Sequence, residues 1–140
     1  MDRHVKDRKV LEVVLSVFLV LTIAGIYLYN LDIPTQIILP KEIDLKEIQL
    51  SEKPVFSVKI INVSNTNVEI ARIYTSCGCT TVLEPTDSFD LKPKSIRDIK
   101  VQFDPSSMHK SGDDVYHEIY ILTTKPSEKE NMVKMIGRIV

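Results

Sequence analysis

The two cysteines, Cys77 and Cys79, are the residues best suited to chemistry, and only Gly78 separates them. A thiol pair at this spacing can form a disulfide, although an extended three-residue segment places the Cα atoms near the upper limit of ~7 Å unless Gly78 relaxes the backbone. Two thiolates could also bind a metal, and they suit Cu(I) better than a structural zinc ion, which needs four ligands. A redox-active or nucleophilic thiol would instead require a neighbouring base or cation.

A structural interpretation competes with these chemical ones. Small, fairly apolar side chains at a strand end can pack into a core, and Gly78 permits a sharp turn there. No His or Lys is next to the pair in the sequence Thr75-Ser76-Cys77-Gly78-Cys79-Thr80. We therefore predict packing or a structural disulfide, with a redox-active pair and a copper site as the alternatives.

Other polar residues are weaker candidates. His109 and His117 are far from the cysteines in the sequence, and we expect His117 to be a satisfied or partly exposed imidazole on a strand rather than a ligand. Met108 and His109 could form a soft metal site, which the polarity of their loop explains equally well. Asp113 and Asp114 fit a solvated turn. Because no catalytic motif is visible, we predict no enzymatic activity, no catalytic residue and no cofactor.

Composition limits the possible functions. The chain has 140 residues and a net charge of −1, with acidic and basic residues mixed along its length. Such a chain accommodates one domain of ordinary size and lacks the basic surface that nucleic-acid binding requires. The absence of Trp and the abundance of Ile and Val favour β-strands. No small-molecule substrate is evident.

The N-terminal segment predicts a membrane anchor. No charged residue occurs from Val13 to Tyr29, and the apolar segment reaches about the 20 residues that a membrane-spanning helix needs. Four basic residues precede it, so the positive-inside rule predicts a cytoplasmic tail at 1–9, a signal-anchor helix at 10–31 and an exported C-terminal domain. This topology implies a single-pass protein of the cell inner membrane. A cleaved signal ending near Ala24 is the alternative, but the apolar run continues beyond that residue.

The remainder of the chain predicts strands. Pro34 and Pro40 indicate an extended linker at 32–45, with room for a short strand between the prolines. Alternating apolar residues then predict about seven short strands in an immunoglobulin-like antiparallel β-sandwich over 46–140. The expected strands are 55–63, 68–74, 97–103, 115–123 and 132–140, with weaker candidates at 46–50 and 81–83.

Several of these segments resemble one known family. The sequences Thr75-Ser76-Cys77-Gly78-Cys79-Thr80, Val101-Gln102-Phe103-Asp104 and Ile136-Gly137-Arg138-Ile139-Val140 are similar to the DUF1573 family of exported bacterial proteins. The resemblance covers about residues 46–140 and implies an immunoglobulin-like domain of the Hydin and major-sperm-protein type. It departs from the family pattern in two turns, at Pro93-Lys94 and at Thr123-Thr124-Lys125-Pro126.

These observations predict a non-catalytic, membrane-anchored module. A short linker keeps the domain near the bilayer, and sandwich edges can pair with strands of another protein. We therefore expect a protein-binding, accessory or assembly subunit of a membrane or cell-envelope complex. The alternative is a periplasmic thiol-redox or Cu(I)-binding protein that uses Cys77 and Cys79.

Overall fold

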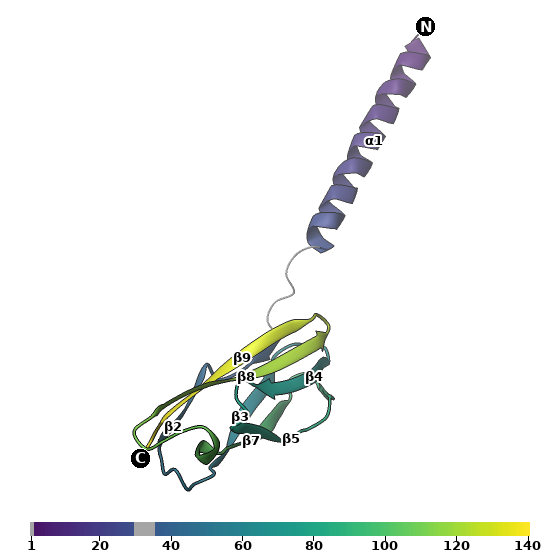
Figure 1. Ribbon diagram of the computed structural model, residues 1–140. Coiled ribbons are helices and arrows are strands. Elements are labelled where there is room, and N and C mark those ends of the chain that lie inside the picture. The colour runs from purple at the N-terminus through teal and green to yellow at the C-terminus, as the bar shows by residue number, and fades with distance from the viewer. Residues whose placement is uncertain (1, 30–35) are drawn as a thin grey trace. The chain divides into compact units, whose positions relative to one another are not determined.

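The computed structural model describes residues 2–29 and 36–140, which form two separate compact units. The first unit contains one helix, α1 (Asp2–Tyr29), and the second contains all the strands (Figure 1). Residue 1 and residues 30–35 lie outside the described part. The end of the predicted anchor and the first part of the predicted linker fall within these residues. Within the described residues, no helix has the length and apolar content required to cross a bilayer.

The second unit is mainly β and consists of two sheets that form a sandwich. Nine strands belong to the described residues, and a 3₁₀ turn, η1 (Pro105–Ser107), follows the strand β7. The four-stranded sheet has the order β1 (Ile37–Ile38), β3 (Val55–Asn62), β7 (Ile96–Phe103) and β5 (Thr80–Glu84). The five-stranded sheet has the order β2 (Glu42–Ile48), β9 (Lys129–Ile139), β8 (Asp114–Lys125), β4 (Val68–Thr75) and β6 (Phe89–Leu91).

The predicted sandwich is confirmed, with corrections to its details. All seven expected strands occur within a few residues of their predicted bounds, and β8 is central, between β9 and β4. The short β6 was not predicted because three residues are too few to show alternation. The sheets are also not entirely antiparallel, since β2 pairs with β9 in parallel.

The first strands begin earlier than residue 46. Ile37 pairs with Asn62 in one sheet, whereas Glu42 pairs with Lys134 in the other, so the chain changes sheets around Pro40. Proline suits this crossing because it cannot donate a hydrogen bond to a continuing ladder. Much of the segment predicted as a linker at 32–45 therefore belongs to the sandwich.

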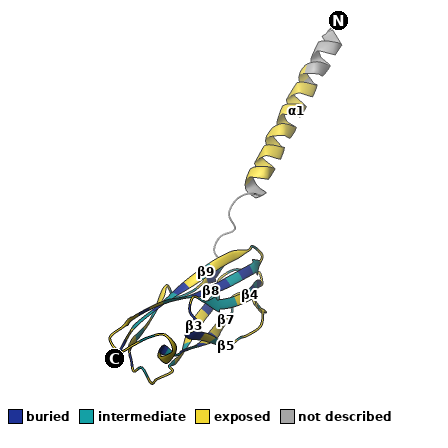
Figure 2. Cartoon of the chain, viewed as in Figure 1, coloured by how far each residue is buried: buried dark blue, intermediate teal, exposed yellow. Residues whose placement is uncertain are grey.

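Buried residues alternate with more exposed ones along strands of both sheets, as the burial colours show (Figure 2). The apolar residues separate into a large aliphatic cluster and a smaller cluster that contains both cysteines. The aliphatic cluster consists of Ile37, Val58, Ile60, Val68, Ile70, Leu91, Ile99, Val101, Ile119, Ile121 and Val133. The sulfur cluster, as we name it, consists of Ile48, Cys77, Cys79, Phe103, Val115, Met135 and Ile139. Most members of the sulfur cluster lie near strand ends, where connecting turns can reach them.

Candidate functional site

The cysteines lie in a turn between β4 and β5 that is fixed to strand β8. Ser76 N donates to Glu118 O at 2.9 Å, and Glu118 N donates back to Ser76 Oγ at 2.9 Å. The Thr75 hydroxyl lies within hydrogen-bond distance of the carbonyl oxygens of Cys77 (3.0 Å) and Thr80 (2.9 Å). Because these polar groups bind the backbone on both sides of the turn, they determine where the sulfur atoms lie.

Cys77 and Cys79 form a disulfide in the structure. Their Cα atoms are 5.1 Å apart, closer than the ~7 Å expected for an extended segment, because the chain turns and Thr80 N donates to Cys77 O. Cys77 is 8% exposed and Cys79 is 1% exposed. The predicted role of Gly78 is not seen, since its φ is not positive and a Cβ there would meet no atom within 4 Å.

His117 lies beside the disulfide, although 38 residues separate it from Cys79 in the sequence. Its Nε2 atom is 3.4 Å from Cys79 Sγ. The antiparallel pairing of β4 with β8 brings the two together, because Thr75 pairs with Ile119 and the cysteine turn then continues past His117. No histidine adjoins the cysteines in the sequence, but the fold brings His117 next to Cys79. His117 alternates in the sequence with Val115 and Ile119, which are buried, and this alternation indicated that its side chain faces inward.

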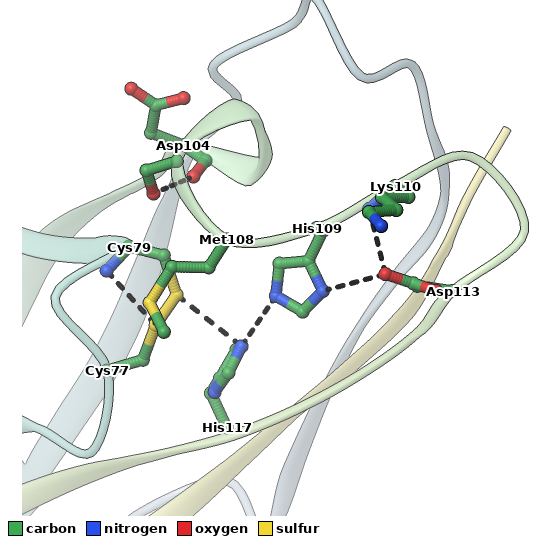
Figure 3. Close-up of polar contacts among 9 residues, drawn as sticks. Cys77, Cys79, Asp104, Met108, His109, Lys110, Asp113 and His117 are labelled. Atoms are coloured by element: carbon green, nitrogen blue, oxygen red, sulfur yellow. Dashed lines mark hydrogen bonds and ion pairs between the residues drawn. A yellow bond between two sulfur atoms is a disulfide. The ribbon is translucent and has the colours of Figure 1, made fainter.

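Met108 and His109 approach the same site from the loop after β7 (Figure 3). Met108 Sδ is 3.5 Å from Cys77 Sγ, and His109 Nε2 is 2.9 Å from His117 Nε2. Asp104 caps η1 by accepting from Ser106 N, and it also forms an ion pair with Lys53. These contacts hold the start of the loop that carries Met108.

The acidic pair after this loop has separate roles. Asp113 Oδ2 accepts from Lys110 N at 2.8 Å and lies 3.9 Å from His109 Nδ1. Asp114 begins strand β8, where it pairs with Arg138 in the β8–β9 ladder. Both are exposed, in agreement with the predicted solvated turn, and neither belongs to the group formed by Cys77, Cys79 and His117.

The electrostatics of the site favour a neutral imidazole. Burial lowers the pKa of His117 below its ordinary value, and the neighbouring His109 lowers it further. The rings of both histidines also lie near Phe103, with centroid separations of 5.6 Å for His109 and 6.0 Å for His117. A neutral imidazole retains a lone pair on one nitrogen, which can accept a proton or bind a metal.

The arrangement therefore unites side chains that the sequence presented separately. Two sulfur atoms and one imidazole nitrogen, from Cys77, Cys79 and His117, all lie within 4.8 Å of one another. This set can support reversible disulfide chemistry and, after reduction, metal binding. Each half of the candidate soft metal site at Met108 and His109 contacts a different member of this set.

Comparison with known proteins adds a family to this description. The family model described as "Protein of unknown function (DUF1573)" matches residues 38–139. The chain belongs to the DUF1573 family. No curated protein matches this DUF1573 chain in sequence.

Solved structures with similar folds come from proteins of different kinds. The YadV chaperone is 14% identical with a TM-score of 0.59, and the match covers 75% of this chain and 52% of that one. A protein of unknown function from Porphyromonas gingivalis W83 is 16% identical with a TM-score of 0.62, over 78% of this chain and 51% of that one. The chain thus spans about half the length of these two proteins.

A third match shows that the fold is not limited to bacterial proteins. The PapD-like domain 7 of human CEP192 is 12% identical with a TM-score of 0.54, over 79% of this chain and 94% of that one. At these identities the comparisons establish a fold, an immunoglobulin-like and PapD-like β-sandwich. They transfer no activity to this DUF1573 domain.

Proposed function

We propose that this DUF1573 protein is a non-catalytic, membrane-anchored module that binds an extended segment of another protein in the cell envelope. The observation that carries the proposal is an open sheet edge along β3. Among the described residues, β1 covers that edge only opposite Ile61 and Asn62, so no strand pairs with residues 55–60 on that side.

The register identifies the backbone groups at the open edge. Asn62 N donates to Ser95 O, and Phe103 N donates to Pro54 O, so the even-numbered residues of β3 hydrogen-bond to β7. In an antiparallel ladder the intervening residues direct their N–H and C=O groups the other way. Val55, Ser57 and Lys59 therefore offer main-chain groups to a strand from a partner.

The other sheet edges are less suited to strand addition. β6 has three residues, and β5 has five with a register shift between Val82 and Glu84. β2 also has a register shift and carries four charged residues among its seven. Short, bulged or charged edges discourage pairing, whereas β3 pairs with β7 in uninterrupted register.

The structural neighbours support a role in protein binding. Several of them are named as chaperones, including YadV, the periplasmic SfaE and DraB of E. coli. Strand addition to a sheet edge is a recurrent way in which β-sandwich proteins bind extended segments. The proposal assigns no catalytic role to the cysteines, which form a disulfide with each other.

The sequence supports the anchored part of the proposal. Residues 13–29 carry no charge, and basic residues are concentrated before them. In α1 the apolar side chains from Leu11 to Tyr27 are exposed within their unit, which leaves them available to lipid. The cytoplasmic tail, the single span and the exported domain are predictions from the sequence and belong to this proposal.

The edge is tested by photocrosslinking in cells. A photoreactive amino acid at Ser57 should crosslink the full-length protein to one partner, whereas the same group at Glu130 on the other sheet should not. Ser57→Pro removes one N–H from the open side without breaking the β3–β7 ladder, so it should abolish co-purification of that partner, and Ser57→Ala should not. A chain that purifies alone and monomeric, or a partner that is retained by Ser57→Pro, would refute strand addition.

Anchoring has its own test. Full-length protein should stay in the membrane pellet after alkaline carbonate extraction, and added protease should digest the domain in spheroplasts but not in intact inside-out vesicles. Release by carbonate would disprove the span, and the opposite protease pattern would disprove the orientation.

A further inference from the structure

We propose that Cys77 and Cys79, once reduced, bind one Cu(I) ion together with His117, and that their disulfide is the metal-free, closed state of this site. The proposal is independent of the partner at β3, because the site lies in the sulfur cluster and uses none of the edge residues. In this proposal the redox state of the two cysteines controls whether the site can bind metal.

The distances fit a single bound ion. Metal–ligand bonds of about 2.0–2.3 Å allow two ligand atoms of one metal to be at most about 4.6 Å apart. The ligand atoms of Cys77, Cys79 and His117 lie within 4.8 Å of one another, and Cys79 Sγ is only 3.4 Å from His117 Nε2. The 4.8 Å bound slightly exceeds that limit, so an ion requires the S–S bond to open and the outermost ligand atoms to move slightly closer together.

The types of ligand select the ion. Two thiolates and an imidazole in an apolar cluster suit the soft, low-coordinate Cu(I), and Met108 adds a thioether 3.5 Å from Cys77 Sγ. Figure 3 shows Met108 beside the disulfide, and its side chain is 68% exposed. A thioether at the surface of a buried site can receive a soft ion first and then transfer it to the thiolates.

His109 distinguishes Cu(I) from Zn²⁺. In the closed state His109 Nε2 and His117 Nε2 share a hydrogen bond of 2.9 Å, so a metal at His117 replaces that bond. A tetrahedral Zn²⁺ site would require both histidines as third and fourth ligands. A Cu(I) site requires His117 and depends on His109 only as a neighbour.

The chemical steps balance with a dithiol as the reductant. One thiolate of the dithiol reductant attacks the Cys77–Cys79 bond and forms a mixed disulfide. The second thiolate of the same reductant then attacks this mixed disulfide and releases both cysteines as thiols. Two electrons and two protons pass from the reductant to the domain, and the reductant becomes a disulfide. Binding of Cu(I) then displaces two protons from the two thiols.

The test is an anaerobic Cu(I) titration of the detergent-solubilised full chain against bicinchoninate. The protein is reduced with a phosphine and desalted, and an unreduced sample serves as the first control. We expect one Cu(I) per chain in the reduced protein and none in the oxidised protein or in the Cys77→Ser/Cys79→Ser variant. X-ray absorption at the copper edge should show two sulfur neighbours and one nitrogen neighbour.

Single substitutions order the ligands. His117→Gln should weaken Cu(I) binding by more than the about 10–100-fold that loss of an outer-shell contact causes, whereas the effect of His109→Gln should not exceed that range. Met108→Leu should slow uptake, and Met132→Leu, an exposed methionine elsewhere, is its matched control. Because Met108 is exposed, this variant reports on the site even if a buried substitution disturbs folding.

Three results would overturn the proposal. In the first, the reduced protein binds no Cu(I). In the second, the Cys77→Ser/Cys79→Ser variant binds Cu(I) as well as the reduced protein does. In the third, His117→Gln and His109→Gln weaken Cu(I) binding equally and Zn²⁺ displaces the bound copper. Circular dichroism of each variant separates loss of the site from loss of the fold.

Discussion

The two clusters of the sandwich interior differ in chemistry although strands β7, β8 and β9 contribute to both. The aliphatic cluster contains no sulfur and no ring, and most of its members lie within strands rather than at strand ends. The sulfur cluster contains Cys77, Cys79, Met135 and Phe103, and His109 and His117 lie against it. Phe56 packs against both clusters and joins them.

This difference teaches where a small sandwich can place chemistry. Side chains in the middle of a sheet are fixed by ladders on both sides, so they suit close aliphatic packing. Strand ends are followed by turns, and here two turns, 76–79 and 104–113, carry sulfur and imidazole groups to one place. Stability and reactivity are therefore assigned to different parts of one domain, and four predictions test that assignment.

The largest effect is expected in the aliphatic cluster. Ile119 is fully buried, so Ile119→Ala should lower the free energy of unfolding by about 2–5 kcal/mol. The matched control, Ile96→Ala, removes an exposed side chain and should change it by less than about 0.5 kcal/mol. Urea denaturation of both variants measures the difference. Equal values would show that the aliphatic cluster does not dominate stability.

The next effect is expected at Asn62, which is fully buried at the end of β3. Its Nδ2 donates to the carbonyl oxygens of Thr66, Leu91 and Lys92, and its Oδ1 accepts from Ser64 N. Asn62→Ala removes these hydrogen bonds from a buried position and should cost about 1–3 kcal/mol. Asn65→Ala, on an exposed turn residue, is the control and should be nearly neutral. A neutral Asn62→Ala would mean that water replaces the side chain.

A smaller effect is expected from the cysteines. A disulfide that closes a three-residue loop restricts the unfolded chain little, so Cys77→Ser/Cys79→Ser should cost about 1–2 kcal/mol. The variant should therefore remain folded, as judged by near-ultraviolet circular dichroism and its urea transition. If it unfolds, the disulfide is needed for the fold and the separation between the two clusters fails.

The smallest effect concerns pH. The folded-state pKa of His117 lies below its ordinary value of 6.5, so the folded protein binds fewer protons than the unfolded chain in this range. The contribution of His117 to stability is complete above about pH 6.5 and declines as the pH falls below it. The slope of unfolding free energy against pH there should be shallower in His117→Gln. An unchanged slope would place the pH dependence in other groups.

The sequence predicted the fold better than the site, for a physical reason. Alternation along β3, β7 and β8 depends on local neighbours, so the sequence itself indicates these strands. The approach of His117 to Cys79 depends on how β4 pairs with β8, which alternation does not encode. The approach of Met108 to Cys77 likewise depends on the path of the loop after β7, which alternation does not encode either.

The most direct test compares the oxidised and the reduced full-length protein in one titration. Urea unfolding and Cu(I) uptake are measured on the same two samples. We predict that reduction leaves the cooperative unfolding transition in place, lowers its midpoint slightly and raises copper uptake from none to one ion per chain. Loss of the transition on reduction, or a reduced, folded protein that takes up no copper, would contradict the assignment of stability to the aliphatic cluster and chemistry to the sulfur cluster.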